Sequence, residues 1–320
     1  MHRRTGQRSF ADEVVADKGH AGKMDRICEV IDWDSVAKLV EPVYSEPTGR
    51  PSYPPLVIVK ALLLAQWYNL SDPQLEEALA DRLSFRRFVG LSLDEPTPDH
   101  VTLWRFRQEL GRQKLDQALF VEINRQLEAR GLVLKKGTLL DATLVQAQAR
   151  PPKGGGPGRG FRSEVDADAD WTRRGRHYFF GYKAHLAVDQ HTNLVRGAVL
   201  TSAKIYESEV ADELICNDEQ AVYADKAYEN KHRRKWLKAC GIKDRIMHRS
   251  HKHQRELPPW QTKRNGLIAP IRKKVERVFG TLKRTYGFTK VRYYSMRSNT
   301  TQLMLMVTAL NLRRAVMLLN

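Results

Sequence analysis

Three acidic residues stand where an ionised carboxylate is costly unless it is paired or bound to a metal ion. Asp141 interrupts the apolar run LLDATLV, and Asp225 directly follows the apolar run AVYA. Glu276 is the single acid in the basic stretch IRKKVERVFGTLKR, residues 271–284. An unpaired buried charge is strongly unfavourable, whereas a divalent cation between close carboxylates removes their repulsion. The three acids together predict a metal-binding site.

Carboxylate, water and phosphate oxygens are the ligands that Mg²⁺ prefers. Two such ions about 4 Å apart activate a water or a 3′-hydroxyl and stabilise the leaving oxygen at a phosphodiester. The expected cofactor is therefore Mg²⁺ or Mn²⁺, with two ions in the site. Each acid also has a simpler interpretation: Asp141 as a satisfied strand-end residue, Asp225 as a helix cap, and Glu276 as an incidental acid on a basic helix.

Residues 271–284 are predicted to form the helix that carries Glu276. An apolar stripe at helical spacing would anchor this helix on a core, and its members are Ile271, Val275, Val278 and Leu282. Arg272, Glu276 and Lys283 share that spacing one position around the helix. A lone acid in a cationic field fits a metal ligand whose basic neighbours, such as Arg272 and Lys283, hold phosphates.

After Gly137 the hydrophobic pattern changes from helical to strand-like. Short apolar runs bounded by turn residues predict strands at 137–145, 177–189, 194–201, 221–228 and 241–249, with helices at 208–215 and 231–239. This order predicts an α/β fold, a ribonuclease-H-like mixed five-stranded sheet with flanking helices. In such a sheet the first and fourth strands are neighbours, so Asp141 and Asp225 would lie side by side.

The segment before the sheet predicts an all-helical N-terminal domain, with five helices between Leu56 and Arg130. Two of them, Ser84–Val89 and Asp99–Leu110, fit a helix-turn-helix variant. That variant would direct four arginines to DNA, namely Arg86, Arg87, Arg105 and Arg107. A dimerisation or packing module with solvated arginines is the alternative, and the sequence leaves both open.

Four parts of the chain are expected. They are an N-terminal arm at 1–50, a helical DNA-binding or dimerisation domain at 51–132, a catalytic domain at 133–297 and a C-terminal helix at 298–320. The Gly-rich run PPKGGGPGRG predicts a flexible loop over 150–176 whose arginines would follow DNA.

Charge and composition narrow the class of partner. The 320-residue chain has a net charge of +17 and a pI near 9.8, which predicts salt-dependent affinity for nucleic acid. Membrane-surface binding is a weaker explanation, because no basic amphipathic anchor lies at a terminus. Three well-separated cysteines, a polar N-terminus and an interrupted C-terminal apolar segment predict a cytoplasmic, nucleoid-associated protein without a membrane span.

With these motifs, the chain resembles the DDE transposases of bacterial insertion sequences, most closely the insertion-sequence-five branch. DATLV, YFFGYKAHLAVD, VYADKAY and the basic helix carry the similarity, which covers nearly the whole chain. The resemblance implies an Asp-Asp-Glu triad at Asp141, Asp225 and Glu276. It also places Arg272 and Lys283 in the family's Tyr-Arg-Glu-Lys signature.

The resemblance implies a transposase that binds the terminal inverted repeats of its element, cleaves the DNA ends by metal-dependent hydrolysis and joins them to target DNA. Double-stranded DNA is the expected partner, and synapsis of two ends implies a homodimer or larger assembly. The signature Tyr is replaced by Ala269, so its role is vacant or filled elsewhere. A nuclease of the same fold without strand transfer and a non-catalytic DNA-binding descendant remain open alternatives.

Three further residues are weaker candidates. Lys226 follows Asp225 and could contact a phosphate, with a solvated strand-end lysine as the equal alternative. Trp260 could stack on an unpaired base near the transposon end, although a packing role is the simpler interpretation. His185 is expected in the core or on the sheet face.

Overall fold

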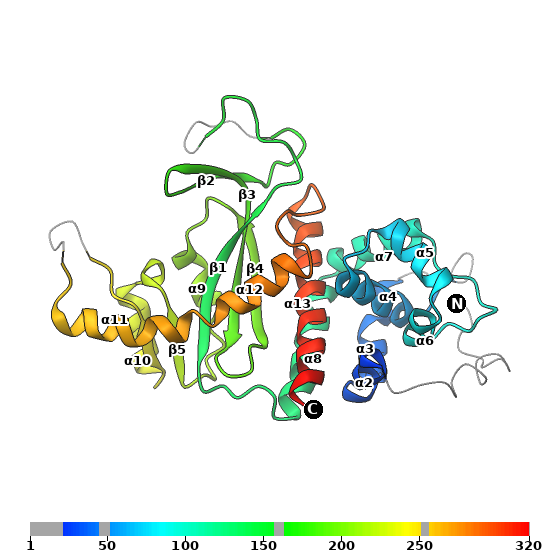
Figure 1. Ribbon diagram of the computed structural model, residues 1–320, viewed down its shortest axis with the longest axis horizontal. Helices are drawn as coiled ribbons and strands as arrows, with labels where there is room; N and C mark the ends of the chain where they lie inside the picture. The colour runs from blue at the N-terminus through cyan, green and yellow to red at the C-terminus, as the bar shows by residue number, and fades with distance from the viewer. Residues whose placement is uncertain (1–21, 45–51, 157–162, 251–255, 320) are drawn as a thin grey trace. The chain divides into compact units, whose positions relative to one another are not determined.

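The computed structural model describes residues 22–44, 52–156, 163–250 and 256–319. The chain forms two compact units (Figure 1). The first comprises the chain up to Arg130 together with the residues from Met304 onward, and the second is Gly131–Leu303. The described part of the first unit is helical, and the second unit contains the β-sheet.

The helical unit is built around α4 (Pro55–Tyr68), in which Leu62, Leu63 and Leu64 are fully buried. The other elements before the sheet are α2 (Lys23–Val30), α3 (Trp33–Val40), η1 (Glu41–Val43), α5 (Asp72–Asp81), α6 (Leu83–Val89), α7 (His100–Arg112) and α8 (Leu115–Ala129). Helix α5 begins with a capping box, which the sequence SDPQ predicts: the Ser71 side chain accepts from the Gln74 N–H, and the Gln74 side chain accepts from the Ser71 N–H.

Two features of this unit differ from the sequence expectation. Within the segment expected as an N-terminal arm, α3 coincides with the one short helix that the sequence predicts at Trp33–Val40, whereas α2 was not predicted, and Ile27 on α2 is buried. Helix α7 begins later than predicted: Asp99 is its cap and accepts the Thr102 N–H at 2.6 Å. The sequence TPDH predicts Thr97 as the cap and Pro98 as the first helical residue; Thr and Asp both favour the N-cap position, and the pattern did not distinguish them.

The long C-terminal helix α13 (Met296–Leu318) joins the helical unit from Met304 onward. The indole N–H of Trp67 in α4 donates to the Ala309 carbonyl at 2.7 Å, and the Asn311 amide donates to the Asn124 side chain at 2.8 Å. No helix in the described ranges has the length and apolarity needed to cross a membrane.

The sheet of the second unit has six strands: β1 (Thr138–Gln146), β2 (Asp170–Arg174), β3 (His177–Asp189), β4 (Val195–Ser202), β5 (Ala221–Ala224) and β6 (Lys243–Ile246). Their order is β2-β3-β1-β5-β6, with β4 also paired to β3. Strands β1, β3 and β4 are antiparallel neighbours, whereas β5 and β6 run parallel to β1. The predicted ribonuclease-H-like α/β class is confirmed, with one strand more than expected.

Strands β1 and β5, the first and fourth of those predicted, are neighbours. Their parallel register pairs Leu139 with Tyr223. Asp141 and Asp225 each lie two residues beyond that pair along the two strands. The sheet therefore carries the two acids side by side, as the strand order predicted.

The extra strand β2 corrects the expectation of a flexible loop over 150–176. β2 pairs antiparallel with the start of β3, so that Arg174 lies opposite His177. We call β2, the turn after it and His177–Phe180 the β2–β3 arm. Gly181 lies where the arm meets the rest of the sheet: its φ is +154°, and a Cβ there would lie 2.3 Å from the Val145 carbonyl oxygen.

Helices α9 (Glu207–Leu214) and α10 (Lys231–Ala239) complete a core with the parallel strands. Its buried members include Leu140, Val210, Val222 and Leu237. Helix α11 (Pro259–Arg272) contacts β5, and α12 (Val275–Arg284) packs on β1.

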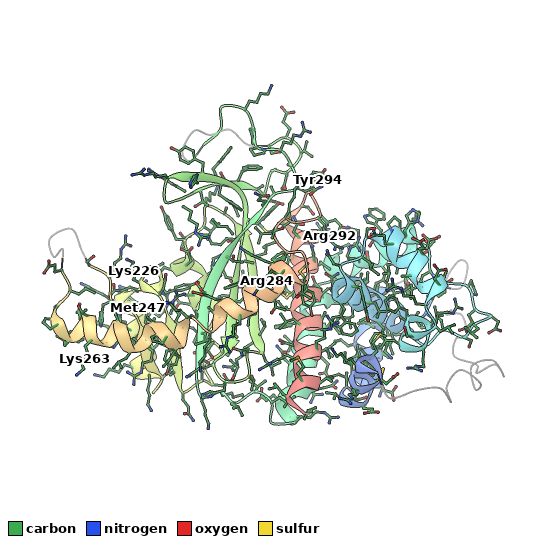
Figure 2. All side chains as sticks on the ribbon, viewed as in Figure 1. Lys226, Met247, Lys263, Arg284, Arg292 and Tyr294 are labelled. Atoms are coloured by element: carbon green, nitrogen blue, oxygen red, sulfur yellow. The ribbon has the colours of Figure 1, made fainter. Side chains whose placement is uncertain are left out.

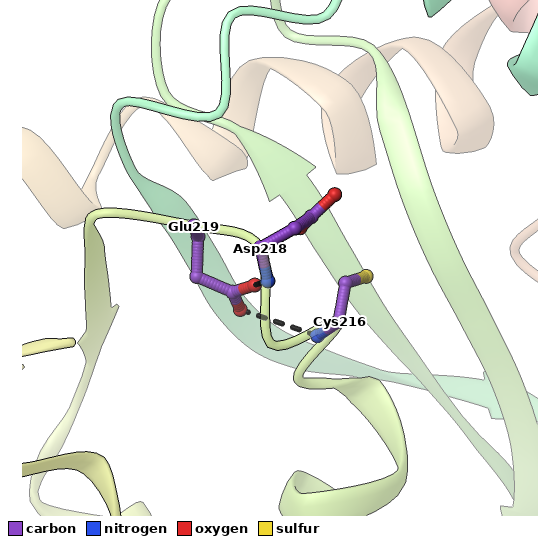
Figure 3. Close-up of side chains that lie close together, drawn as sticks. All are labelled: Cys216, Asp218 and Glu219. Carbon is purple, nitrogen blue, oxygen red and sulfur yellow. Dashed lines mark hydrogen bonds between the residues drawn. The ribbon is translucent and has the colours of Figure 1, made fainter. Parts of the chain in front are cut away.

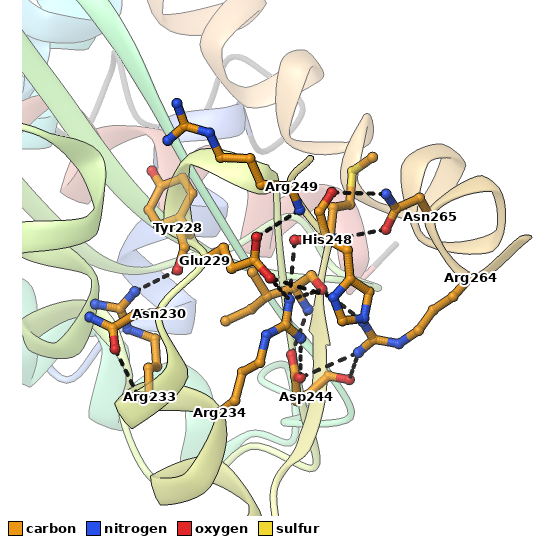
Figure 4. A network of polar contacts seen from close by, with 12 residues as sticks. Tyr228, Glu229, Asn230, Arg233, Arg234, Asp244, His248, Arg249, Arg264 and Asn265 are labelled. Atoms are coloured by element: carbon orange, nitrogen blue, oxygen red, sulfur yellow. Dashed lines mark hydrogen bonds and ion pairs between the residues drawn. The ribbon is translucent and has the colours of Figure 1, made fainter. Parts of the chain in front are cut away.

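Side chains bonded to main-chain groups fix α11 to the end of β6 (Figure 4). The Asn265 amide accepts the His248 N–H at 2.8 Å and donates to the His248 carbonyl at 3.0 Å. Arg264 donates to the Asp244 carbonyl at 2.6 Å. Because Arg272 is the last residue of α11, these bonds also hold the helix that presents it.

Candidate active site

Asp141, Asp225 and Glu276 line one cleft of about 470 Å³ in the second unit. Asp141 comes from β1, Asp225 from the residue after β5, and Glu276 from the first turn of α12. Three elements that are distant in sequence thus bring together the three acids that the sequence singled out.

Asp141 is mostly buried and pairs with an arginine. Nη1 of Arg272 donates to Oδ2 of Asp141 at 2.8 Å, and the Ala142 N–H donates to Oδ1 at 3.0 Å. Burial raises the pKa of Asp141 to about 6, and Asp225 adds to the rise, although Arg272 lowers it. The effect of burial on the pKa of Asp141 therefore outweighs the opposite effect of Arg272.

Asp225 and Glu276 have few partners among the described residues. Oδ1 of Asp225 accepts the Ala227 N–H at 2.7 Å and caps the short helix η2 (Lys226–Tyr228). The simpler interpretation of Asp225 as a helix cap is thus also correct, since one oxygen caps while the residue lines the cleft. The Glu276 side chain is exposed, and no described group pairs with it.

The donor set fits a hard divalent cation. The carboxylates of Asp141, Asp225 and Glu276 line one polar cleft, and burial, together with the nearby Asp225, raises the pKa of Asp141. Oxygen-only ligands suit Mg²⁺ or Mn²⁺ better than soft metals, which favour sulfur and imidazole. Asp141, Asp225 and Glu276 would hold such ions.

The predicted helix around Glu276 is interrupted. Helix α11 ends at Arg272, α12 begins at Val275, and the N–H of Glu276 bonds the Lys273 carbonyl at 3.0 Å across a tight turn. The expected apolar anchor is nonetheless present, because Val275, Val278 and Leu282 are buried. Arg272 and Lys283 both line the cleft.

Two cleft residues were not identified from the sequence. Lys183 of β3 and Glu207 at the start of α9 form an ion pair with 3.0 Å between Nζ and Oε1, and the Lys183 side chain is 7% exposed. Alternation along β3 placed Lys183 on the sheet face, but the position of Glu207 depends on the chain path into α9. His185, two residues from Lys183, is fully buried, as expected for a core residue.

Lys226 and Trp260 do not line the cleft. Lys226 is exposed in η2 beside Asp225 (Figure 2). Trp260 lies in the first turn of α11, where a loop was expected, and is 60% exposed. Its ring packs edge-on against His248 with 5.3 Å between ring centroids.

Of the helical-unit arginines, Arg105 is exposed but Arg107 is buried. Both terminal nitrogens of Arg107 donate to the Asp72 carboxylate at 2.7 Å, and its side chain is 3% exposed. Arg86 is also buried and donates to the Glu95 carbonyl at 2.6 Å. The prediction that Arg107 and Arg86 face DNA is therefore wrong: Arg105, two residues before Arg107, and Arg87, directly after Arg86, are the exposed ones.

Among the described residues, Cys216, Asp218 and Glu219 are the one group of acidic, cysteine or histidine side chains whose ligand atoms all lie within 4.8 Å of one another (Figure 3). The three acids of the cleft lie farther apart than that. The Glu219 carboxylate accepts the main-chain N–H groups of Cys216 and Asp218. Asp218 forms ion pairs with Lys135 and Arg196. Because cations of the protein already neutralise these acids, the group is a structural turn.

Among known proteins, a family model described as "Transposase DDE domain" matches residues 134–312, more than half of the chain. The chain belongs to this family. A second family model, "Transposase domain (DUF772)", matches residues 10–109. The predicted DDE transposase family is confirmed, and the insertion-sequence-five branch stays a prediction.

Two solved structures of transposases are similar to this DDE-family chain. One is a piggyBac transposase synaptic complex with hairpin DNA, with 8% identity, coverage of 92% of this chain and 74% of that chain, and a TM-score of 0.48. The other is a Mos1 strand transfer complex, with 12% identity, coverage of 88% and 92%, and a TM-score of 0.20.

Proposed function

We propose that the chain is the transposase of a bacterial insertion sequence, of the insertion-sequence-five branch. It binds the terminal inverted repeats of its element, cleaves the DNA ends by metal-dependent hydrolysis and joins the 3′-hydroxyls to target DNA. The observation that carries this proposal is the meeting of Asp141, Asp225 and Glu276 in one cleft of a DDE-family domain.

In this proposal the three acids hold two Mg²⁺ or Mn²⁺ ions. Bound divalent ions activate a water or a 3′-hydroxyl and stabilise the leaving oxygen of the phosphodiester. Asp141 and Asp225 provide ligands from adjacent rigid strands, which keeps their spacing fixed, and Glu276 closes the site from α12. None of these residues acts as a nucleophile, so no covalent protein–DNA intermediate is needed.

Basic residues around the acids would bind double-stranded DNA at the transposon ends and the target. Lys283 lines the cleft about two helical turns after Glu276, and the net charge of +17 provides a long-range attraction to phosphates. Because two transposon ends must be held together before joining, we propose a homodimer or larger assembly on DNA.

The proposal is tested with Glu276→Gln and Asp225→Asn, which keep side-chain size and remove the charge. Supercoiled plasmid carrying the element's ends is incubated with Mg²⁺, and nicking and double-strand cleavage are measured. We expect each variant to lose cleavage by about 100-fold or more, since metal-assisted charge stabilisation supplies several kcal/mol. Glu209→Gln, an exposed acid in the first turn of α9, is the matched control and should retain activity.

Cleavage that Glu276→Gln retains, or that chelation with EDTA leaves unchanged, would contradict the three-carboxylate site. A second assay offers a pre-cut end with a free 3′-hydroxyl and an unrelated plasmid. Joined products establish strand transfer, whereas hydrolysis without joining identifies a nuclease of the same fold.

A further inference from the structure

The cations of the cleft divide into those paired with acids and those that are not. Lys183 pairs with Glu207 at 3.0 Å, and Arg272 pairs with Asp141 at 2.8 Å. Arg173, Arg174 and Lys283 line the same cleft, and no described acid pairs with any of these side chains. The cleft thus carries unmatched positive charge besides its acids.

Two of these unmatched cations, Arg174 and Lys283, come from different elements around the cleft. Arg174 is the last residue of β2 in the β2–β3 arm, and Lys283 lies in the last turn of α12. They are near enough to interact, because Arg174 contributes, after burial, to a lowered pKa of Lys283. Two like charges facing one another raise the free energy of the protein unless an anion lies between them.

The β2–β3 arm as a whole is positively charged. The sequence from Trp171 to Val188 contains no Asp or Glu, whereas the tip of the arm carries Arg173, Arg174, Arg176 and His177. Arg173 Nε donates to the Gly175 carbonyl at 2.9 Å and so orders the turn. An ordered basic arm beside the catalytic acids is suited to a polyanion and not to a small neutral ligand.

We propose that the β2–β3 arm forms the second wall of a DNA channel, in which Arg174 and Lys283 hold the same backbone phosphate from two sides. This inference rests on the proposed function and assigns to it a phosphate site that the triad does not include. The guanidinium of Arg174 can donate two parallel hydrogen bonds to phosphate oxygens, and Lys283 adds a point charge from α12.

The phosphate site explains why the arm is a paired strand and not a loose loop. β2 is joined to β3 by continuous pairing from Asp170 to Arg174. β3 continues into the sheet beside β1, where Leu186 lies opposite Asp141. Arg174 is therefore connected to the strand of Asp141 through a rigid sheet, which sets the distance between the held phosphate and the catalytic acids.

The test compares Arg174→Ala, Lys283→Ala and the double variant with Arg245→Ala. Arg245 is an exposed arginine on β6, the edge of the sheet opposite β2, and is a matched control. Binding of a fluorescein-labelled duplex to the full chain is measured by anisotropy in EDTA over a series of KCl concentrations. Thermal unfolding of each variant confirms that it is folded.

We expect each single variant to bind about 5- to 10-fold more weakly and to lose about one unit from the slope of log K against log salt. Because both residues hold one phosphate, the double variant should resemble a single variant instead of showing the product of the two losses. Arg245→Ala should bind as the wild type does.

Two outcomes would overturn the inference. If Arg174→Ala has the affinity and salt slope of Arg245→Ala, the arm does not bind phosphate. If the two losses multiply, Arg174 and Lys283 do not share a phosphate. Failure of this inference is distinct from failure of the proposed function. A protein that cleaves and joins DNA can lack the shared phosphate site, and a protein that only binds DNA can have it.

Discussion

The guanidinium of Arg272 donates a hydrogen bond to the carboxylate of Asp141 over 2.8 Å. The two residues are 131 positions apart in sequence, and both line the cleft that holds Asp225 and Glu276. The sequence predicted Arg272 as a DNA contact, whereas its bond in the structure is to a proposed metal ligand. Arg272 thus compensates part of the negative charge of Asp141, in addition to any divalent cation that binds in the cleft.

This ion pair predicts that Arg272→Gln binds Mn²⁺ more tightly and cleaves DNA more slowly. Removing the guanidinium frees an Asp141 oxygen and removes a positive charge that repels the ion, so the Kd for Mn²⁺ should fall by about tenfold. Cleavage should fall because Arg272 no longer positions Asp141. Metal affinity is measured by calorimetry near pH 8, above the pKa of about 6 of Asp141.

Arg277→Gln is the control for this prediction, because Arg277 is exposed on α12 and does not line the cleft. It should leave the Kd for Mn²⁺ unchanged. Weaker Mn²⁺ binding by Arg272→Gln would show that the arginine supports the metal site and does not compete with the ion.

The buried ring of His185 predicts that the second unit loses stability in acid. The ring is fully buried and its Nε2 lies 2.9 Å from the Thr201 hydroxyl, while burial and then Lys183 lower its pKa to about 4. Above the unfolded pKa of 6.5 the ring is neutral in both states, and no free energy is lost. As the pH falls from 6.5 toward 4, only the unfolded chain gains the proton, and stability falls.

The measurement compares urea unfolding of the wild type and His185→Gln near pH 8 and pH 5. We expect the wild type to lose about 2 kcal/mol more than the variant between the two pH values, since 1.5 pH units below 6.5 correspond to that free energy. Equal losses in the two proteins would mean that His185 is protonated in the folded state.

The close contacts around Gly181 predict that adding a single methyl group there strongly destabilises the sheet. In Gly181→Ala the Cβ would lie 2.3 Å from the Val145 carbonyl oxygen and 2.6 Å from the Ala147 nitrogen, at a φ of +154°. The β1–β3 pairing must shift at the base of the β2–β3 arm, so we expect a loss of about 3 kcal/mol or more in unfolding free energy.

Gly197→Ala on β4 is the matched control, because its Cβ would meet only ordinary contacts at 3.4 Å to Leu214 and 3.5 Å to Ala187. Thermal unfolding of both variants provides the comparison. A Gly181→Ala protein as stable as Gly197→Ala would show that β1 and β3 can separate locally without cost.

The sequence predicted the acids and their strands because local patterns determine both. An Asp within an apolar strand is unusual by itself, and the order of strands and helices then fixed β1 and β5 as neighbours. The capping residues of α5 and the apolar stripe of α12 are likewise local. These features needed no knowledge of distant contacts.

The features that the sequence did not predict depend on tertiary contacts. β2 follows a Gly-rich stretch, and its short sequence DWTRR forms a strand because β3 extends beyond β4 and offers it a partner. The partner of Glu207 is likewise selected by the path of the chain into α9.

Substitutions of Arg107 and Arg105 are expected to separate folding from DNA binding in the helical unit. Arg107→Ala leaves the Asp72 carboxylate, 20% exposed, without its bidentate partner between α5 and α7. Breaking such a buried pair costs about 3 kcal/mol, so the unit should unfold at a lower urea concentration. Arg105→Ala, at an exposed position two residues away, should leave stability unchanged.

Affinity for duplex DNA then decides what Arg105 does. If α7 faces DNA, Arg105→Ala binds a labelled duplex more weakly by about fivefold and with a smaller salt slope, because one phosphate contact is lost. Wild-type affinity together with a changed dimerisation constant in sedimentation equilibrium would instead assign α7 to the contact between two copies of the chain. Both measurements use the full chain, so that a change in folding detected for Arg107→Ala is not mistaken for a change in binding.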